Sequence, residues 1–365
     1  MSQNVLRYVG GCHTAKGFYS LYPSNLEGIE HLFLLKGKLF TAGSKWLQHL
    51  VEAWSTEGDT IEVMQSSEHP GEVEAVLLPE QKVAIYGGST PLPPLHKVKK
   101  TIISLDQALL LDELDKDKQV MERYTRKIAQ KYEHVHRAFQ KGLRIHDDLE
   151  QIYIQQMDFG KADEEANRLI EKLFTEKTEK ASKQVHRFLG SSTPEGPKDY
   201  IQHLTASLDT RYFLKGRAGT GKSTFLRHII RAAEENGYDM EIYHCGFDPE
   251  SIDMVVLREL SVALFDSTSP HEYFPERDGD HLIDLYDIAV MPETDEKYAK
   301  EIAITTKRYK SWMKKGSRYL KEAKEYFDKR EALYEKAVDK NLLDGILRTA
   351  EQRVNQLLKK EDEHH

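Results

Sequence analysis

The sequence contains few cysteines and no long apolar run. Only two of its 365 residues are cysteine, Cys12 and Cys245, and two cysteines cannot build the disulfide framework of a small secreted protein. No apolar stretch approaches the roughly 18 residues that a membrane-spanning helix needs. The chain does not start with the basic and then apolar segments of a secretory signal. These absences predict a cytoplasmic protein that has no membrane span.

Basic residues are fewer than acidic ones. The 52 Lys+Arg and 60 Asp+Glu give a formal net charge of -8, which does not favour binding to the phosphate backbone of nucleic acid. Residues 307–324 are a local exception, because lysines and arginines alternate there with aromatic residues. Such a stretch is more often the solvated face of an amphipathic helix, so nucleic acid is not an expected partner.

An internal repeat divides the chain. With a shift of 179 residues (190 − 11), residues 11–91 align with 190–270 without a gap. The same register matches Gly-x-x-Thr-x-x-Gly at 11–17 with 190–196, and Leu-Lys-Gly at 35–37 with 214–216. A single register held over this length indicates an ancient duplication. We therefore expect two copies of one fold rather than two different domains.

Both copies have the pattern of an α/β fold. An apolar strand leads through a loop into an amphipathic helix, a second strand follows, and a proline-containing turn precedes two further strands. This alternation is typical of layered α/β units with a mainly parallel sheet, and Gly237 is suited to end the helix of the second copy. The predicted strands are 32–35, 61–64, 73–78 and 83–86 in the first copy and 212–214, 240–243, 254–257 and 262–265 in the second.

A long helical segment follows each α/β unit. Apolar residues recur in steps of three and four, first over a long stretch and then over a shorter one, which predicts an antiparallel helical hairpin or coiled coil after each unit. Gly142 and Gly316 occupy equivalent positions in the two long stretches. Glycine at such a seam either allows close helix approach or is a tolerated weak point. The predicted domains are 1–100 and 186–297 for the α/β units, and 101–185 and 298–365 for the helical hairpins.

One motif in the second copy carries specific chemistry. Residues 216–224 fit the phosphate-loop pattern G-x-x-x-x-G-K-[ST] between an apolar strand and an amphipathic helix. Glycines let backbone N–H groups turn toward phosphate oxygens, and the start of a helix favours an anion. Lys222 would neutralise the β- and γ-phosphates, and the Ser223 hydroxyl would bind Mg²⁺. The predicted nucleotide contacts are Gly216, Arg217, Ala218, Gly219, Thr220, Gly221, Lys222, Ser223 and Thr224.

A carboxylate is expected at the end of a neighbouring strand, where it would hold Mg²⁺. The segment Ser-Val-Ala-Leu-Phe-Asp at 261–266 fits, so Asp266 is the predicted metal-binding residue; the alternative is a turn residue after a buried strand. No glutamate follows Asp266. The general base that many motor-type ATPases have at this place is therefore missing, and rapid hydrolysis by that arrangement is not expected.

Two other polar residues are weaker candidates. Asp248 follows the second strand in Phe-Asp-Pro, and its alternatives are a catalytic or acceptor-binding role and an Asp-Pro turn. His271 lies just beyond Asp266 and either reaches the γ-phosphate or belongs to a surface loop. The predicted catalytic residues are thus Lys222, Asp266 and Asp248.

The first copy lacks the chemistry of the phosphate loop. Phe40 aligns with the loop glycine Gly219, and Gly43 aligns with Lys222. Ala42 replaces another loop glycine, and Gly87 stands where the second copy has its metal-binding aspartate. A phenylalanine would fill the space of the phosphates. We predict that the first copy binds no Mg·nucleotide and serves as a scaffold, regulator or partner surface.

These motifs resemble those of the P-loop NTPase superfamily, and in particular a bacterial family of tandem P-loop proteins labelled ATPase or nucleotide kinase-like. The resemblance rests on the loop, the Phe-Asp-Pro segment, residues 266–271 and the duplicated Gly-x-x-Thr-x-x-Gly segments. It implies two duplicated three-layer P-loop units, with ATP or GTP and Mg²⁺ bound by the second copy alone. It does not supply an acceptor.

Three functions are compatible with these features. The inactive duplicate and the helical hairpins, which offer a surface for a protein partner, favour an ATPase or nucleotide-driven switch. The absence of a glutamate after Asp266 favours a kinase that transfers the γ-phosphate to a nucleotide or other small molecule. The third possibility is a scaffolding protein that holds its nucleotide structurally.

Overall fold

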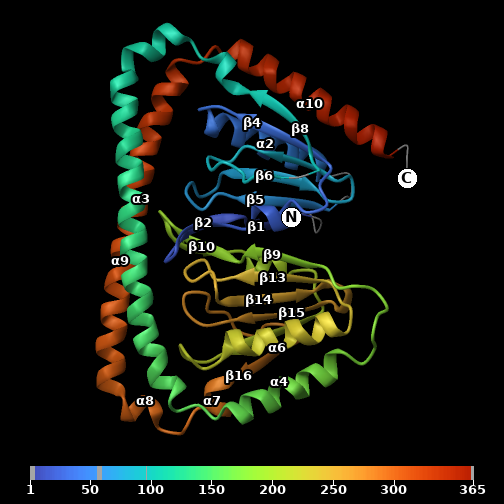
Figure 1. Cartoon of the computed structure of the whole chain (residues 1–365), viewed down its shortest axis with the longest axis vertical. Coiled ribbons are helices and arrows are strands. Elements are labelled where there is room, and N and C mark those ends of the chain that lie inside the picture. Colours follow the sequence, from blue (N-terminus) through green and yellow to red (C-terminus); the bar gives the residue numbers. More distant parts are fainter. Residues whose placement is uncertain (1–4, 56–59, 96, 363–365) are drawn as a thin grey trace.

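The computed structural model describes residues 5–55, 60–95 and 97–362. Twelve of its strands form one mixed sheet, and two short hairpins lie near the centre of that sheet (Figure 1). In sheet order, the strands of the first half are β1 (Val5–Val9), β5 (Ile61–Gln65), β6 (Val73–Leu78), β7 (Val83–Tyr86), β4 (His31–Lys36) and β8 (Lys99–Ser104). Those of the second half are β9 (Gln184–Phe188), β13 (Met240–His244), β14 (Ile252–Leu257), β15 (Val262–Asp266), β12 (Thr210–Lys215) and β16 (Asp280–Asp284). The hairpins are β2 (Gly11–Thr14) with β3 (Gly17–Ser20) and β10 (Gly190–Thr193) with β11 (Gly196–Asp199).

Each half of the sheet has the same strand order. Within the first half only β6 runs against the other strands, and β14 is the equivalent exception in the second half. The prediction of an α/β fold with a mainly parallel sheet is confirmed, and the predicted strands are all present. The strands β1, β8, β9 and β16 and the two hairpins are additional, and the expected boundaries at 100 and 185 fall within β8 and β9.

The two halves join edge to edge, which the sequence does not indicate. Val9, the last residue of β1, pairs in antiparallel orientation with Phe188, the last residue of β9. These positions are again 179 residues apart (188 − 9). The junction therefore brings equivalent residues of the two copies face to face.

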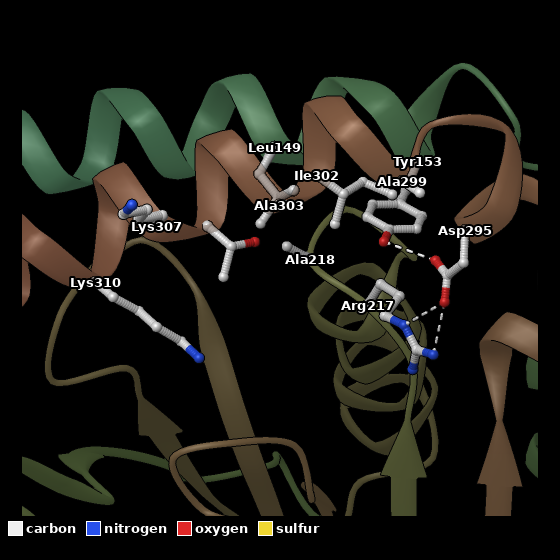
Figure 2. A pocket seen from close by; sticks show the side chains of 11 residues that line it. Leu149, Tyr153, Arg217, Ala218, Asp295, Ala299, Ile302, Ala303, Lys307 and Lys310 are labelled. Atoms are coloured by element: carbon white, nitrogen blue, oxygen red, sulfur yellow. Dashed lines mark hydrogen bonds and ion pairs between the residues drawn. The ribbon is translucent and has the colours of Figure 1, made fainter.

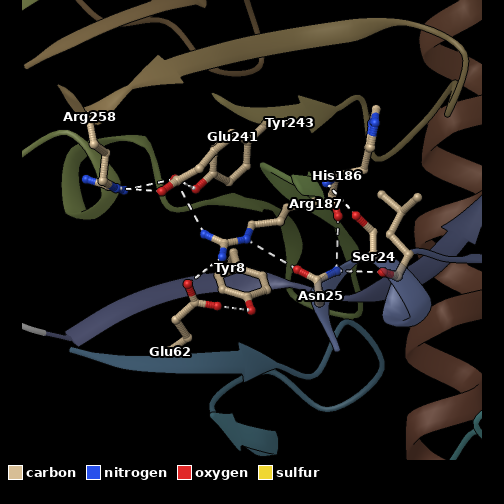
Figure 3. Close-up of polar contacts among 10 residues, drawn as sticks. Tyr8, Ser24, Asn25, Glu62, His186, Arg187, Glu241, Tyr243 and Arg258 are labelled. Atoms are coloured by element: carbon tan, nitrogen blue, oxygen red, sulfur yellow. Dashed lines mark hydrogen bonds and ion pairs between the residues drawn. The ribbon is translucent and has the colours of Figure 1, made fainter. Parts of the chain in front are cut away.

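A buried arginine connects the halves at this junction (Figure 3). Arg187 on β9 lies 2.5 Å from Glu62 of β5 and 3.4 Å from Glu241 of β13. Its guanidinium also lies over the ring of Tyr8, which donates a hydrogen bond to Glu62. Glu62 and Glu241 are equivalent positions (241 − 62 = 179). A guanidinium has five donors. The one of Arg187 thus compensates the negative charges of two carboxylates, one from each half, that occupy equivalent positions.

Amphipathic helices cover the strands of each half. The buried residues of α2 (Phe40–Trp54) pack on the first half, and those of α6 (Lys222–Glu235) pack on the second. Gly237 ends α6 as predicted: its φ is 76°, and the next N–H, of Tyr238, donates back to the carbonyl of Ala233, as in a Schellman motif. The short helical segments are α1 (Tyr22–Asn25), η1 (Leu105–Ala108), α5 (Ile201–Leu204), η2 (Arg258–Leu260), α7 (Leu285–Ala289) and α8 (Thr294–Lys297).

The predicted helical hairpins are wrong in their pairing. The long helix α3 (Leu111–Ile154) packs along α9 (Ala299–Lys336) rather than against the helix that follows it, α4 (Phe159–Leu173). α4 packs instead on α6 and α7 of the second half, and α10 (Lys340–Asp362) packs on the core of the first half. An apolar stripe predicts that a helix face is buried, but not which element buries it. Each half thus contributes a helix to the other (Figure 1).

Close packing along the seam between α3 and α9 explains why Gly142 and Gly316 are glycines. A side chain at Gly316 would collide with the ring of Phe139, and a Cβ at Gly142 would lie 3.3 Å from the sulfur of Met313. Glycine therefore allows close helix approach at both positions, which decides between the two expected alternatives. The two helices run across the sheet at the carboxyl ends of its parallel strands (Figure 1). Within the described ranges, no helix is both long and apolar enough to cross a membrane.

Candidate phosphate-binding site

The loop between β12 and α6 has the backbone conformation that its glycines predict. Gly216, Gly219 and Gly221 have φ values of 153°, 79° and 81°, which residues with side chains rarely adopt. α6 begins directly afterwards at Lys222. The first N–H groups of such a helix have no intrahelical acceptor and lie at its positive end. Loop and helix together therefore offer donors to an anion.

Lys222 and Asp266 lie beside each other at this loop. β12 pairs in parallel with β15, which puts Asp266 opposite Leu214 at the end of the strand. The Nζ of Lys222 lies 3.7 Å from Oδ2 of Asp266 and donates to the carbonyl oxygen of Arg217 at 2.8 Å. The other carboxylate oxygen of Asp266 accepts hydrogen bonds from Thr268. The fold thus brings together the two residues that the sequence assigns to phosphate and Mg²⁺.

The Ser223 hydroxyl has a structural contact in addition to its predicted metal role. Its oxygen accepts the backbone N–H of Ile252 at 3.0 Å. The equivalent residue of the first half, Ser44, accepts the N–H of Val73 at 2.7 Å in the same way. Because the half without the loop keeps this bond, the bond itself belongs to the fold. Ser223 still has its hydroxyl proton and a second lone pair, so binding of Mg²⁺ stays a prediction.

A second carboxylate, Asp253, lies in the strand next to Asp266. β14 and β15 are antiparallel neighbours with Met254 opposite Phe265, so Asp253 lies one residue further toward Asp266. Asp253 is buried, and burial together with the charge of Asp266 raises its pKa to about 6. Sequence analysis missed this residue, although a single aspartate in the apolar run Ile-Asp-Met-Val-Val-Leu is the signal that could have found it.

The two weaker candidates lie in different surroundings. Asp248 lies in the turn after β13, with Oδ1 4.0 Å from the Nζ of Lys16, a residue of the first half. The Nδ1 of His271 is 2.7 Å from a carboxylate oxygen of Asp199. Burial acts to lower the pKa of His271, but the hydrogen bond and the charge of Asp199 outweigh it and raise that pKa. His271 is therefore held by a hydrogen bond to β11, whereas Asp248 lies where the second half contacts the first.

The helix α3 lies directly over the loop, an arrangement that no sequence pattern indicates. A Cβ on Gly219 would be 2.5 Å from the carbonyl oxygen and 2.9 Å from the Cα of Glu150. Burial and the negative charge of Asp147 raise the pKa of Glu150, while the charge of Lys222 acts to lower it. Burial, followed by the charge of Lys222, lowers the pKa of His146. Glu150 and His146 of α3 thus share the electrostatic environment of the loop lysine.

His146, Asp147 and Glu150 of α3 are residue types that can ligate a metal ion, and they lie close together. Donor atoms of His146, Asp147 and Glu150 all lie within 4.8 Å of one another, which a shared cation would permit. Acidic groups lie this close on many protein surfaces without an ion, so we assign no metal to them. The hard oxygen donors that suit Mg²⁺ are the Ser223 hydroxyl and the Asp266 carboxylate.

A cavity of about 690 Å³ opens beside the loop, between α3 and α9 (Figure 2). Its wall at the loop is fixed by an ion pair, since Arg217 Nη2 lies 2.8 Å from Asp295. Tyr153 of α3 donates to the same carboxylate at 2.8 Å. The cavity therefore connects the loop with both long helices. Its lining includes Leu149, Ala218, Ile302 and Lys310.

The equivalent place in the first half is filled by protein. α2 starts at Phe40, so helix replaces the loop that precedes α6. The Phe40 ring packs against His69 and against Phe327 of α9. The backbone N–H of Thr41 donates to the buried carboxylate of Glu331 on α9 at 3.2 Å. A phenyl ring and an internal carboxylate thus occupy the region that corresponds to the phosphate loop.

The first half also contains a buried polar chain that sequence reasoning missed. His13 bonds through Nδ1 to His136 at 2.9 Å and through Nε2 to Glu68 at 2.7 Å. Glu68 also accepts from Ser89. Burial acts to raise the pKa of Glu68, but His13 outweighs it and holds that pKa at about 2. These residues come from four separate segments, and none forms a short motif.

Known proteins give no further guidance to this site. Comparisons of the sequence with protein-family models and curated proteins, and of the fold with solved structures, each found no match. Lys222 of the loop and Asp266, which the sequence predicts as its partner at the end of a neighbouring strand, are 3.7 Å apart.

Proposed function

We propose that the second half binds Mg·ATP or Mg·GTP at residues 216–224 and cleaves the γ-phosphate. The proximity of Lys222 to Asp266, beside three glycines with positive φ, carries this proposal. Positive charge and free N–H donors on one side, and a carboxylate on the other, are the complement of a metal-bound phosphate chain.

Each residue has a definite task in this proposal. The loop N–H groups and the Lys222 ammonium hold the β- and γ-phosphates. The Ser223 hydroxyl and the Asp266 carboxylate hold Mg²⁺, which would neutralise charge that develops on the transferred phosphoryl group. Lys222 must turn from the Arg217 carbonyl, its present acceptor, to the phosphate oxygens.

The reaction that we favour is hydrolysis coupled to a structural switch. The loop contacts α3 at Gly219 and Glu150, and α3 packs along α9. A change in the phosphate that the loop holds would therefore act on both long helices. In the first half, Phe40 and Glu331 fill the corresponding space. This half would stay in place while the nucleotide moves the long helices.

The alternative function is a kinase. The cavity of about 690 Å³ beside Arg217 and Ala218 offers room for a small-molecule acceptor. Asp248, in the turn after β13, acts electrostatically on Glu150 of α3 and would orient the acceptor hydroxyl. No glutamate follows Asp266, which is also consistent with an acceptor other than water.

Turnover of ATP and GTP by the wild type and by Lys222→Ala, with and without a panel of nucleosides, nucleotides and metabolites, tests both functions. Hydrolysis without an added acceptor, lost in Lys222→Ala, would support the switch. Turnover that requires one acceptor would support the kinase instead. Lys45→Ala is the matched control, because Lys45 lies on α2 in the half that lacks the loop.

A further inference from the structure

The helix that covers the phosphate loop belongs to the other copy of the repeat. α3 follows the last strand of the first half, yet its Glu150 backbone is in contact with Gly219 of the second half. Gly219 has a φ of 79° and no room for a Cβ on this side. The loop is thus shaped for α3 as well as for an anion.

Glu150 is the acidic residue of α3 whose backbone contacts the loop at Gly219. Its side chain is about one-third exposed, and it is electrostatically coupled to Lys222. After Asp266, the last residue of β15, the chain continues with Ser267, Thr268 and Ser269. None of these is a base at neutral pH. A base for the reaction must therefore come from another element.

The corresponding position of the first half differs. Gly142 of α3 and Gly316 of α9 are equivalent seam positions, a shift of 174 (316 − 142). The same shift takes Glu150 to Lys324 (150 + 174). At this aligned position, the helix that covers the glycine loop has a carboxylate, and the helix that covers the filled one has a lysine.

We propose that Glu150 is the general base for hydrolysis of the γ-phosphate, so that the catalytic site is built from both halves of the chain. This inference rests on the proposed function, because it needs a nucleotide in the loop. Glu150 takes the place of the glutamate that does not follow Asp266.

The step balances without another reactant. A water oxygen attacks the γ-phosphorus while the bond from that phosphorus to the oxygen of the β-phosphate breaks. The Glu150 carboxylate accepts the proton of the water, and the electron pair of the broken bond stays on the nucleoside diphosphate. The proton then leaves to solvent or to the released inorganic phosphate, which restores the carboxylate.

The groups around Glu150 suit a base. His146 and Asp147 share its helix, Lys222 faces it from α6, and Asp248 faces it from the turn after β13. Burial and the nearby negative charges raise its pKa, which brings a carboxylate closer to the pH at which a base works well. Only Lys222 opposes this shift.

The test measures binding and chemistry separately. ATP affinity in the presence of Mg²⁺ is measured by calorimetry, and hydrolysis by single-turnover kinetics, for the wild type, Glu150→Gln and Asp148→Asn. We expect Glu150→Gln to bind ATP as the wild type does but to hydrolyse it about 10²- to 10⁴-fold more slowly. It should also lose the acidic limb of the pH–rate profile, which a merely structural residue would not remove. Asp148, an exposed neighbour on α3, should be replaceable without effect.

The possible failures are distinguishable. If the wild type binds neither ATP nor GTP, the proposed function fails. If it binds and hydrolyses ATP while Glu150→Gln keeps the wild-type rate and pH profile, only the role of Glu150 is overturned. The role is equally overturned if Asp147→Asn, rather than Glu150→Gln, abolishes hydrolysis, or if the wild type transfers phosphate only to an added acceptor.

Discussion

The carboxylate of Glu331 accepts the backbone N–H of Thr41, at the start of α2. This contact is the internal counterpart of an anion at a helix N-terminus. α9 supplies the carboxylate to the first half, while α3 lies over the glycine loop of the second. The two copies thus keep the same helix-over-loop arrangement, but in one of them the anion is part of the chain.

Restoring the loop sequence in the first half will not create a second nucleotide site. In the variant Phe40→Gly, Ala42→Gly, Gly43→Lys, the Glu331 carboxylate still competes for the helix N-terminus, and Gly87 still supplies no metal ligand. We expect one Mg·ATP per chain by calorimetry, as in the wild type. Two bound nucleotides per chain would contradict this explanation of the lost site.

A methyl group at Gly219 should separate the loop from α3. Gly219→Ala places a Cβ 2.5 Å from the Glu150 carbonyl oxygen and also forces a side chain into positive φ. Gly196→Ala is the matched control, since its φ is 110° and a Cβ there meets no atom within 4 Å. Overpacking costs typically about 1–3 kcal/mol, so urea unfolding should show Gly219→Ala to be less stable than the control by that amount. Equal stability of the two variants would show that α3 does not need to contact the loop.

The buried carboxyl of Glu74 makes stability depend on pH. Burial, with the charge of Glu68, raises its pKa from 4.5 to about 8. The folded state therefore binds more protons than the unfolded state between pH 4.5 and 8, and stability from this group is lost as the pH rises through that window. The slope should be at most about 1.4 kcal/mol per pH unit.

Glu74→Gln isolates this contribution. The variant keeps an acceptor for the Tyr22 hydroxyl, which bonds to Glu74 at 2.9 Å, but it does not titrate. Measured by urea unfolding at several pH values, its stability relative to the wild type should increase as the pH rises from 4.5 to 8. A difference that does not vary with pH would contradict the raised pKa.

Removing the arginine of the junction should destabilise the whole sheet. Arg187→Ala would leave Glu62 and Glu241 buried without their shared cation, a change that typically costs about 3–5 kcal/mol. Arg168→Ala removes an exposed pair with Glu165 and should cost less than about 1 kcal/mol. Comparable losses in the two variants would mean that the junction does not depend on this network.

The sequence is most informative where chemistry or periodicity is local. The repeat register and the apolar runs predicted four of the six sheet strands in each half, and residues 216–224 predicted the loop and its helix. Asp266 could be placed near Lys222 because parallel neighbouring strands end at the same edge.

The rest depends on contacts between distant segments. The apolar faces of α4 and α10 do not reveal that each packs on the other half, and Val9 and Phe188 carry no signal that they pair. Glu150 is one of many charged residues on a long helix, and only the position of α3 over Gly219 distinguishes it from Asp148. Such relationships are set by packing, which no short pattern records.

The most direct test is calorimetric titration of the full chain with ATP in the presence of Mg²⁺, carried out on the wild type, Lys222→Ala and Lys45→Ala. We predict one nucleotide per chain for the wild type and for Lys45→Ala. Lys222→Ala should bind at least about tenfold more weakly, since a hydrogen bond to a charged group contributes about 1.5–3 kcal/mol. Unchanged affinity in Lys222→Ala, or a wild type that binds neither ATP nor, in the same titration, GTP, would contradict the assignment of residues 216–224 as the nucleotide site.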